Sequence, residues 1–242
     1  MTLKKQLTEI IRDTYQDWFS ARKLPLKCEK GCATCCSVNV KTTSVEGELI
    51  YDYIKDTKRE QWFAEKLNGV VGTESLKRTT NGFAAICLAG EDVSEVDPVG
   101  GGQCPFLVEA MCLIYPVRPF SCRCFVSQIS CQKQDTAEVE QIVLTASTVI
   151  MQLLEHVAQR EYWGNLQDVL LALSDLPGHK NVQQCLNDRS HEAQARARLL
   201  SGQSIPGFLL DEVEYKVIMP LLEQIFNKTI DGKRIEDILN GK

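Results

Sequence analysis

The spacing of apolar residues predicts helices over most of the chain. Over residues 2–22 the apolar positions recur every three or four residues, which places them on one face of a helix that ends before Pro25. Shorter helices are expected over 45–56, after Ser44 as N-cap, and over 59–70 and 74–90. Longer helical runs follow over 137–163, 166–176 and 212–229.

The segments between these helices predict short strands, turns and loops. Val38 and Val40 alternate with polar residues, which indicates a short strand over 37–43. An acidic, glycine-rich loop covers 91–103, and the proline-containing stretch 104–125 favours strands and turns over helix. The pattern therefore predicts a mainly helical α+β fold, with helices wrapped around an irregular cysteine-rich core that contains short strands.

The chain is expected to form a single domain over 1–242. Residues 28–126 would be its cysteine-cluster core and residues 136–242 a helical elaboration. Its length of 242 residues and its 44% hydrophobic content are enough to bury a substantial core.

Charge and hydropathy exclude some partners. The net charge of -5 gives no basic surplus to neutralise phosphates, so no nucleic acid is expected. No stretch reaches the roughly 18 consecutive apolar residues of a membrane span, so no membrane partner is expected either. The first residues are charged throughout and lack the apolar run of a secretory signal, which favours a cytoplasmic protein. The partner would be another protein or a small molecule that the sequence does not identify.

Eleven cysteines carry the most specific chemical signal. Four of them fall within "CEKGCATCC" at residues 28–36, and a second group follows after residue 103. An odd number cannot pair completely within one chain, and a reducing compartment disfavours disulfides. The clusters therefore predict metal binding.

Sulfur-rich coordination selects zinc or iron–sulfur clusters. Structural zinc and 4Fe–4S clusters each take four ligands, so eight cysteines suffice for two centres, or for one centre with cysteines to spare. The predicted ligands are Cys28, Cys32, Cys35, Cys36, Cys104, Cys112, Cys122 and Cys124.

Three details of the cysteine groups stay open at this point. The neighbouring side chains of Cys35 and Cys36 are expected to diverge, so that one of them serves a second centre or packs in the core. Cys131 is either a ligand or a bystander. Arg118 and Arg123 flank the second group, where they would either offset thiolate charge or pack within the loop.

The motifs around these cysteines resemble those of the cysteine-cluster family of zinc- or iron-chelating domains. The shared features are a four-cysteine loop that ends in Cys-Cys, the motif "CPFL", and "CLIYPVRPFSCR". The resemblance covers about residues 28–126 and carries over to Cys28, Cys32, Cys35, Cys36, Cys104, Cys112 and Cys122. The family often has a further cysteine after the Cys-Arg pair, a place for which Cys124 and Cys131 compete. A more distant group with a similar cluster, the flagellin lysine methylases, implies S-adenosylmethionine as a cofactor and methyl transfer as an activity.

Two other enzymatic readings use the first loop alone. Cys28, Cys32 and Cys35 have the spacing of radical S-adenosylmethionine enzymes, but no repeated strand–helix units follow. Cys32 and Cys35 have the spacing of a thiol oxidoreductase but lack its strand–helix–strand surroundings. Neither reading explains the second cysteine group.

Three functional classes remain, and the sequence does not decide whether the protein is an enzyme. An iron–sulfur cluster would serve chemistry, such as S-adenosylmethionine-dependent modification or electron transfer. A closed zinc site would stabilise a module for protein–protein interaction. A metal carrier would hold its metal in an exchangeable form. Cys87 and Cys185 lie in apolar surroundings and are expected to be buried hydrophobic residues.

Overall fold

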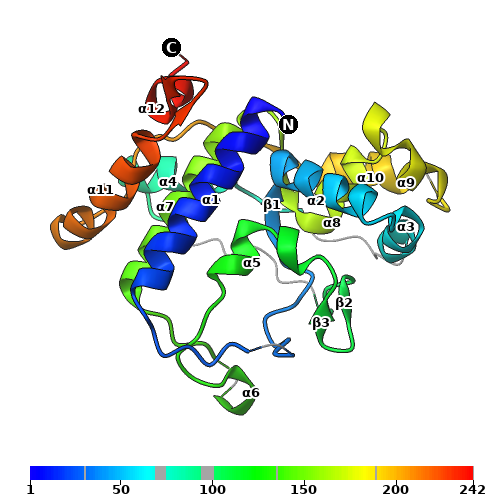
Figure 1. Cartoon of the computed structure of the whole chain (residues 1–242), viewed down its shortest axis with the longest axis horizontal. Coiled ribbons are helices and arrows are strands. Elements are labelled where there is room, and N and C mark those ends of the chain that lie inside the picture. Colours follow the sequence, from blue (N-terminus) through cyan, green and yellow to red (C-terminus); the bar gives the residue numbers. More distant parts are fainter. Residues whose placement is uncertain (30, 69–74, 94–100, 135, 189, 242) are drawn as a thin grey trace.

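The computed structural model describes residues 1–29, 31–68, 75–93, 101–134, 136–188 and 190–241. Within these residues the chain is mainly helical with short antiparallel strands, which confirms the predicted α+β class (Figure 1). Most of the predicted 91–103 loop and the segment 69–74 lie outside the described residues. The prediction of one domain over 1–242 stays a prediction.

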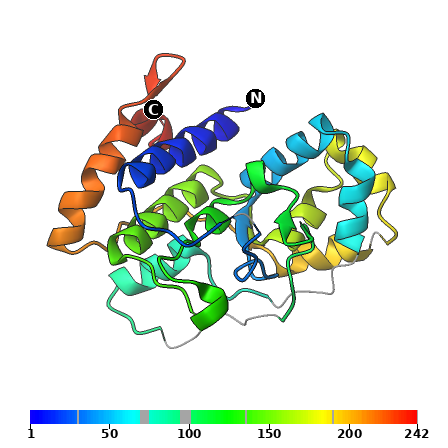
Figure 2. The same cartoon turned by 60° about the horizontal axis from the view of Figure 1, so that its bottom comes forward.

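The first of two hydrophobic cores joins the two ends of the chain. Helix α1, Leu3–Ala21, begins at Thr2, whose side chain accepts a hydrogen bond from the backbone N–H of Lys5. Its apolar face packs on α7, Gln141–Val157, and on α11, Glu212–Phe226. Figures 1 and 2 show these three helices side by side, with α12, Ile235–Leu239, next to α11.

The second core is built from shorter helices. Helix α2, Ser44–Asp56, packs on α8, Leu166–Leu173, and on α3, Glu60–Asn68. Phe63 and Phe106 stack there with ring centroids 5.5 Å apart, and Tyr51 meets Phe63 edge to face at 5.2 Å. Helices α9, Lys180–Gln184, and α10, Ser190–Arg198, cover the outer side of this core (Figure 1).

A small antiparallel sheet connects the two cores. Strand β4, Tyr162–Asn165, lies between β1, Lys41–Thr43, and β5, Leu200–Ser201. The described strands pair antiparallel throughout, so this part of the chain has none of the parallel strand–helix repeats of radical S-adenosylmethionine enzymes.

The remaining described elements are short. They are α4, Thr80–Leu88; β2, Leu107–Val108; β3, Met111–Cys112; the 3₁₀ helix η1, Tyr115–Val117; α5, Phe120–Cys124; α6, Cys131–Gln134; the 3₁₀ helix η2, Pro177–His179; β6, Thr229–Ile230; and β7, Lys233–Arg234.

Several predicted boundaries were wrong for local reasons. Thr43, not Ser44, is the N-cap of α2, because the Thr43 hydroxyl accepts from the backbone N–H of Glu46 and the Glu46 carboxylate accepts in return. The helix predicted from residue 74 begins only at Thr80, after the N-cap Thr79. The run predicted to be helical through residue 163 ends at Val157, and its last residues enter β4.

Gly202 occupies a position that a larger residue cannot fill. A Cβ atom there would lie 2.7 Å from the carbonyl oxygen of Ala158, which is backbone and cannot move aside cheaply. We expect Gly202→Ala to lower the free energy of unfolding by about 1–3 kcal/mol through this overpacking. Urea denaturation of Gly202→Ala and Gly178→Ala measures it, because a Cβ atom at Gly178 would meet no atom within 4 Å. Equal stability of the two variants would contradict the prediction.

His179 makes stability depend on pH. Its ring stacks on Tyr51 at 3.8 Å between centroids, and its Nδ1–H donates to the Leu173 carbonyl at 2.7 Å. Burial lowers the pKa of His179, outweighing Glu48 and Asp52, which raise it; Lys5 also lowers it. As the pH falls, His179 of the unfolded chain takes up a proton near pH 6.5, the usual pKa of histidine. His179 of the folded chain takes up its proton only at a lower pH.

The stability that neutral His179 contributes is consequently complete above about pH 6.5 and is lost as the pH falls below it. Denaturation midpoints at several pH values should fall less steeply for His179→Gln than for the wild type, while exposed His191→Gln keeps the wild-type slope. Identical slopes for all three proteins would refute this role.

Candidate metal site

The first cysteine loop is held by backbone hydrogen bonds to two other segments. Lys27 N–H donates to the Ser127 carbonyl at 2.8 Å, and Val38 N–H donates to the Gly102 carbonyl at 3.2 Å. Cys104 N–H donates to the Cys36 carbonyl at 3.0 Å. In Figures 1 and 2 the segment between α1 and β1 passes between α6 and the β2–β3 hairpin, beside α5. The two cysteine groups therefore lie together although about 70 residues of sequence separate them.

Tight turns shape the first loop. Cys32 N–H donates to the Glu29 carbonyl at 3.0 Å, and Gly31 has a φ of 92°, a left-handed conformation that favours glycine. Cys36 N–H donates to the Ala33 carbonyl at 3.0 Å in a second turn. These consecutive turns present four cysteines on a short piece of backbone, which neither a helix nor a strand would do.

The second group lies partly on the β2–β3 hairpin. Cys112 is paired in register with Leu107, and Leu107 N–H donates to the Cys104 carbonyl at 3.1 Å. Glu109 and Ala110 connect the strands and both have positive φ, as a two-residue type I′ turn requires. Cys104 and Cys112 are thereby fixed at one end of the hairpin, packed against the second core.

Helix α5 places its two cysteines in different surroundings. Cys122 packs against the second core and Cys124 against the first. Residues two apart in a helix point to nearly opposite sides, whereas in a strand they would share one side. The prediction of strands and turns over 104–125 is confirmed for the β2–β3 hairpin, but it was wrong to exclude helix, because η1 and α5 lie in the same stretch.

Electrostatic contacts connect eight thiols into one network. Burial raises the pKa of Cys28 most, and the charges of Cys32, Cys35 and Cys131 raise it further. The pKa of Cys36 is lowered mainly by Cys35, and it is raised in part by the charges of Cys104, Cys112 and Cys122. Cys35 belongs to both sets, because its charge contributes to raising the pKa of Cys28 and that of Cys122. The members are Cys28, Cys32, Cys35, Cys36, Cys104, Cys112, Cys122 and Cys131.

Cys35 and Cys36 link the two sets directly. The interaction between the two neighbouring thiols raises the pKa of Cys35 and lowers that of Cys36. Burial is the main cause that raises the pKa of Cys104, to about 11, and of Cys122.

The structure separates Cys124 from the other predicted ligands. Its Sγ donates to the Phe120 carbonyl at 3.1 Å inside α5, and Ser147 of α7 is close enough to lower its pKa. Burial raises the pKa of the Cys124 thiol to about 12. Cys131, at the start of α6, instead lies beside Cys28.

Neither of the cysteines predicted to be buried is fully buried. Cys185 is exposed, so that prediction was wrong, and Cys87 is half-buried.

The donor set fits zinc or an iron–sulfur cluster, because four thiols stand on each side of the Cys35–Cys36 link. In the described ranges, no three cysteine, histidine or acidic side chains converge closely enough to ligate one metal ion as they stand. Ligation would therefore require the thiol side chains to turn toward a common centre. A cation there would attract the thiolates that now raise one another's pKa.

Two side chains that sequence reasoning missed organise the surroundings of the thiols. Glu46 is 3% exposed and accepts from Phe120 N–H at 2.7 Å, where α5 begins. Arg12 of α1 and Arg118 both lie near Arg123, and after burial their charges lower the pKa of Arg123, to about 10. A glutamate three residues after a threonine is a capping-box signal, so Glu46 was findable in the sequence, whereas Arg12 carries no such signal.

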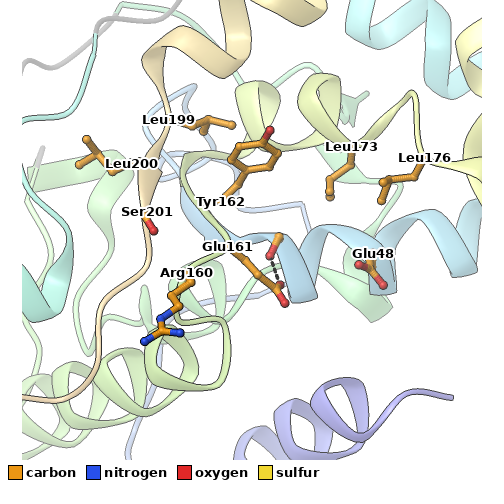
Figure 3. A pocket seen from close by; sticks show the side chains of 10 residues that line it. Glu48, Arg160, Glu161, Tyr162, Leu173, Leu176, Leu199, Leu200 and Ser201 are labelled. Carbon is orange, nitrogen blue, oxygen red and sulfur yellow. Dashed lines mark hydrogen bonds between the residues drawn. The ribbon is translucent and has the colours of Figure 1, made fainter.

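Two pockets lie away from the thiols. The first, of about 520 Å³, has an apolar wall of Leu173, Leu176 and neighbouring leucines, with Glu48 and Glu161 at its edge (Figure 3). Ser44 donates to Glu161 at 2.6 Å, and Lys4 forms an ion pair with the same carboxylate. This carboxylate is therefore already engaged within the protein.

The other pocket, of about 600 Å³, lies among α4, α7 and the sheet. Trp163, Phe83 and Lys41 belong to its mixed polar and apolar wall. The Lys41 carbonyl accepts from the Ser121 hydroxyl at 2.5 Å, and Ser121 directly precedes Cys122. Strand β1 thus connects the wall of this pocket to the second cysteine group.

Comparison with known proteins agrees with the donor set. Residues 27–144 match the model of the CxxCxxCC family, described as "Putative zinc- or iron-chelating domain". This part of the chain matches that family, as the motifs predicted, and the match supports metal binding. No curated protein and no solved structure matches the chain. In the described residues no helix has the length and apolar character needed to cross a membrane.

We expect Glu46→Ala to destabilise the protein by about 2–4 kcal/mol, because it leaves the buried Phe120 N–H and the α2 N-cap without an acceptor. Urea denaturation measures the loss. Glu48→Ala is the matched control on the same helix, since Glu48 only forms a partly exposed ion pair with Lys5 and should cost less than about 1 kcal/mol. A loss at Glu46 no larger than at Glu48 would contradict the role given to Glu46.

Proposed function

We propose that the protein holds two adjacent thiolate-ligated metal centres, and that these are 4Fe–4S clusters. The first centre would use Cys28, Cys32, Cys35 and Cys131. The second would use Cys36, Cys104, Cys112 and Cys122. The observation that carries this proposal is the network of eight thiols, which divides into two sets of four at the Cys35–Cys36 link.

The assignment replaces Cys124 by Cys131. Cys124 lies on the side of α5 opposite to Cys122 and packs against the first core. Cys131, in contrast, is close enough to Cys28 for its charge to contribute to raising the pKa of that thiol. A cubane cluster takes four cysteines, and two sets of four satisfy two clusters without a spare thiol. Zinc satisfies the same ligand count, so the metal is decided by experiment.

The proposed role is chemical rather than purely structural. The 600 Å³ pocket beside Trp163 has the volume of a small-molecule site, and β1 connects its wall to the second centre. A cluster-dependent modification enzyme that uses S-adenosylmethionine, in the manner of a methyltransferase, is consistent with this arrangement. The cluster would supply redox or Lewis-acid chemistry, while the chain would bind the substrate and position it.

Anaerobic purification followed by metal and sulfide analysis tests the proposal. We expect iron, sulfide and a broad absorption band at about 400 nm. Cys131→Ser should lower the iron content by about half, because it opens one of two four-cysteine centres. Cys124→Ser is the matched control and should retain the full iron content.

The alternatives give different results in the same experiment. Stoichiometric zinc without a visible band would refute the iron–sulfur proposal and favour a structural interaction module. Readily exchanged metal would favour a carrier. Iron loss in Cys124→Ser but not in Cys131→Ser would overturn the ligand assignment. Calorimetric titration of the iron-loaded protein with S-adenosylmethionine then tests the enzymatic role, which absence of binding would contradict.

A further inference from the structure

Arg12 is the most unusual charged residue of the described structure. It is only 8% exposed, and its Nε lies buried without a hydrogen-bond partner. Within the described part of the chain, Arg12 forms no ion pair and no side-chain hydrogen bond. A buried N–H group without an acceptor carries a desolvation cost, so such groups are normally hydrogen-bonded.

A second guanidinium group, from another element, lies near Arg12. Arg123 of α5 lies near Arg12, and Arg118 is a further neighbouring charge. Figures 1 and 2 show α5 beside α1, and the rings of Tyr15 and Phe120 meet edge to face at 4.9 Å where the two helices pack. Three positive charges thus gather next to the second cysteine group.

The nearby carboxylates do not neutralise these charges. Glu46 lies near Arg123, but its two oxygens are occupied by Phe120 N–H and by the Thr42 and Thr43 groups of the capping box. Asp13 is exposed and follows Arg12 on α1. None of the three arginines forms an ion pair with a described residue.

The two outer arginines are held in fixed positions. Arg123 donates from Nη2 to the Pro116 carbonyl at 2.8 Å and from Nε to the Arg118 carbonyl at 3.2 Å. Arg118 donates to the Tyr115 carbonyl at 2.8 Å, and its guanidinium lies 3.6 Å from the centre of the Tyr115 ring. Both side chains are thus preorganised, and the hydrogen bonds leave further N–H groups of each for a ligand.

One more polar group lies on the same face of α1. Thr8 precedes Arg12 by four residues, which is about one helical turn, and its buried hydroxyl has no partner. The Thr8 hydroxyl and the Arg12 Nε lack acceptors, and they lie near two arginines that have further N–H groups available, so together they form a set of donors that an oxyanion satisfies. We propose that Arg12 and Arg123, with Arg118 at the rim, bind the phosphate or carboxylate group of an anionic small molecule between α1 and α5.

Arginine suits this task because its planar fork binds phosphate and carboxylate oxygens in pairs. The bound anion would offset the repulsion between the guanidinium groups and supply the acceptor that Arg12 lacks. It would also lie near the second thiol set, since Arg118 lowers the pKa of Cys112. The site concerns the arginines of the "RPFSCR" motif and does not depend on which metal the thiols hold.

Thermal unfolding of the metal-loaded protein in inorganic phosphate tests the site, with sodium chloride at equal ionic strength as reference. We expect phosphate at ten times its Kd to raise Tm by about 4 °C over chloride. Sodium succinate in a parallel titration distinguishes a carboxylate ligand from a phosphate ligand. Metal content measured before and after each titration separates this result from any change at the thiols.

Variants assign the effect to named residues. Arg12→Met and Arg123→Gln should each weaken anion binding about tenfold or more, as expected for lost charged hydrogen bonds. Arg234→Gln is the control, because Arg234 lies in β7 and pairs with exposed Glu236. If Arg12→Met does not fold, Arg123→Gln decides. Stabilisation by neither phosphate nor succinate beyond chloride, or an unchanged anion response in the folded variants, would overturn the proposal.

Discussion

The buried carboxylate of Glu46 holds the two halves of the cysteine-rich region in register. Its Oε1 accepts from the first N–H of α5, and its Oε2 accepts from the Thr42 and Thr43 groups that begin α2. The first cysteine loop runs into β1 and α2, while Cys122 lies on α5. The Glu46 side chain therefore links the segment that follows the first cysteine group to the helix that carries Cys122. A carboxylate buried at 3% exposure is stable only when its acceptor sites are filled, as they are here. The position of α5, and with it the direction of Cys122, therefore depends on this contact.

The geometry of α5 also explains which part of the site the sequence could predict. Dense cysteines and their motifs were sufficient to predict a thiolate site, and the network contains seven of the eight predicted ligands. The eighth depended on local conformation. Cys122 and Cys124 would share a ligand direction in a strand, but in a helix they point to different cores. Five residues are too few for periodicity to distinguish the two conformations, so the sequence could not show that Cys124 packs against the first core.

The fold was predictable where apolar spacing was long and regular. Helices α1 and α7 follow from such spacing because their buried faces recur over several turns. Strand β4 was missed because its four residues follow α7 closely and are too few to show a period of their own, and only the pairing with β1 and β5 makes them a strand. Arg12 was missed for a different reason. Its significance arises from a second guanidinium group more than 100 residues away, and single-sequence reasoning has no access to such contacts.

The division between rigid supports and an irregular loop suits metal binding. The hairpin, α5 and the two cores fix one set of thiols, while the first loop is held mainly by turns and a few backbone hydrogen bonds. Thiolates brought together without a cation repel one another, which raises the pKa of several members of the network. A cation reverses this repulsion, so metal binding and the final ordering of the loop are thermodynamically coupled. Because the anchors at Ser127, Gly102 and Cys104 already bring the loop close, the metal has to order only a short segment. Most of its binding free energy then remains available for affinity.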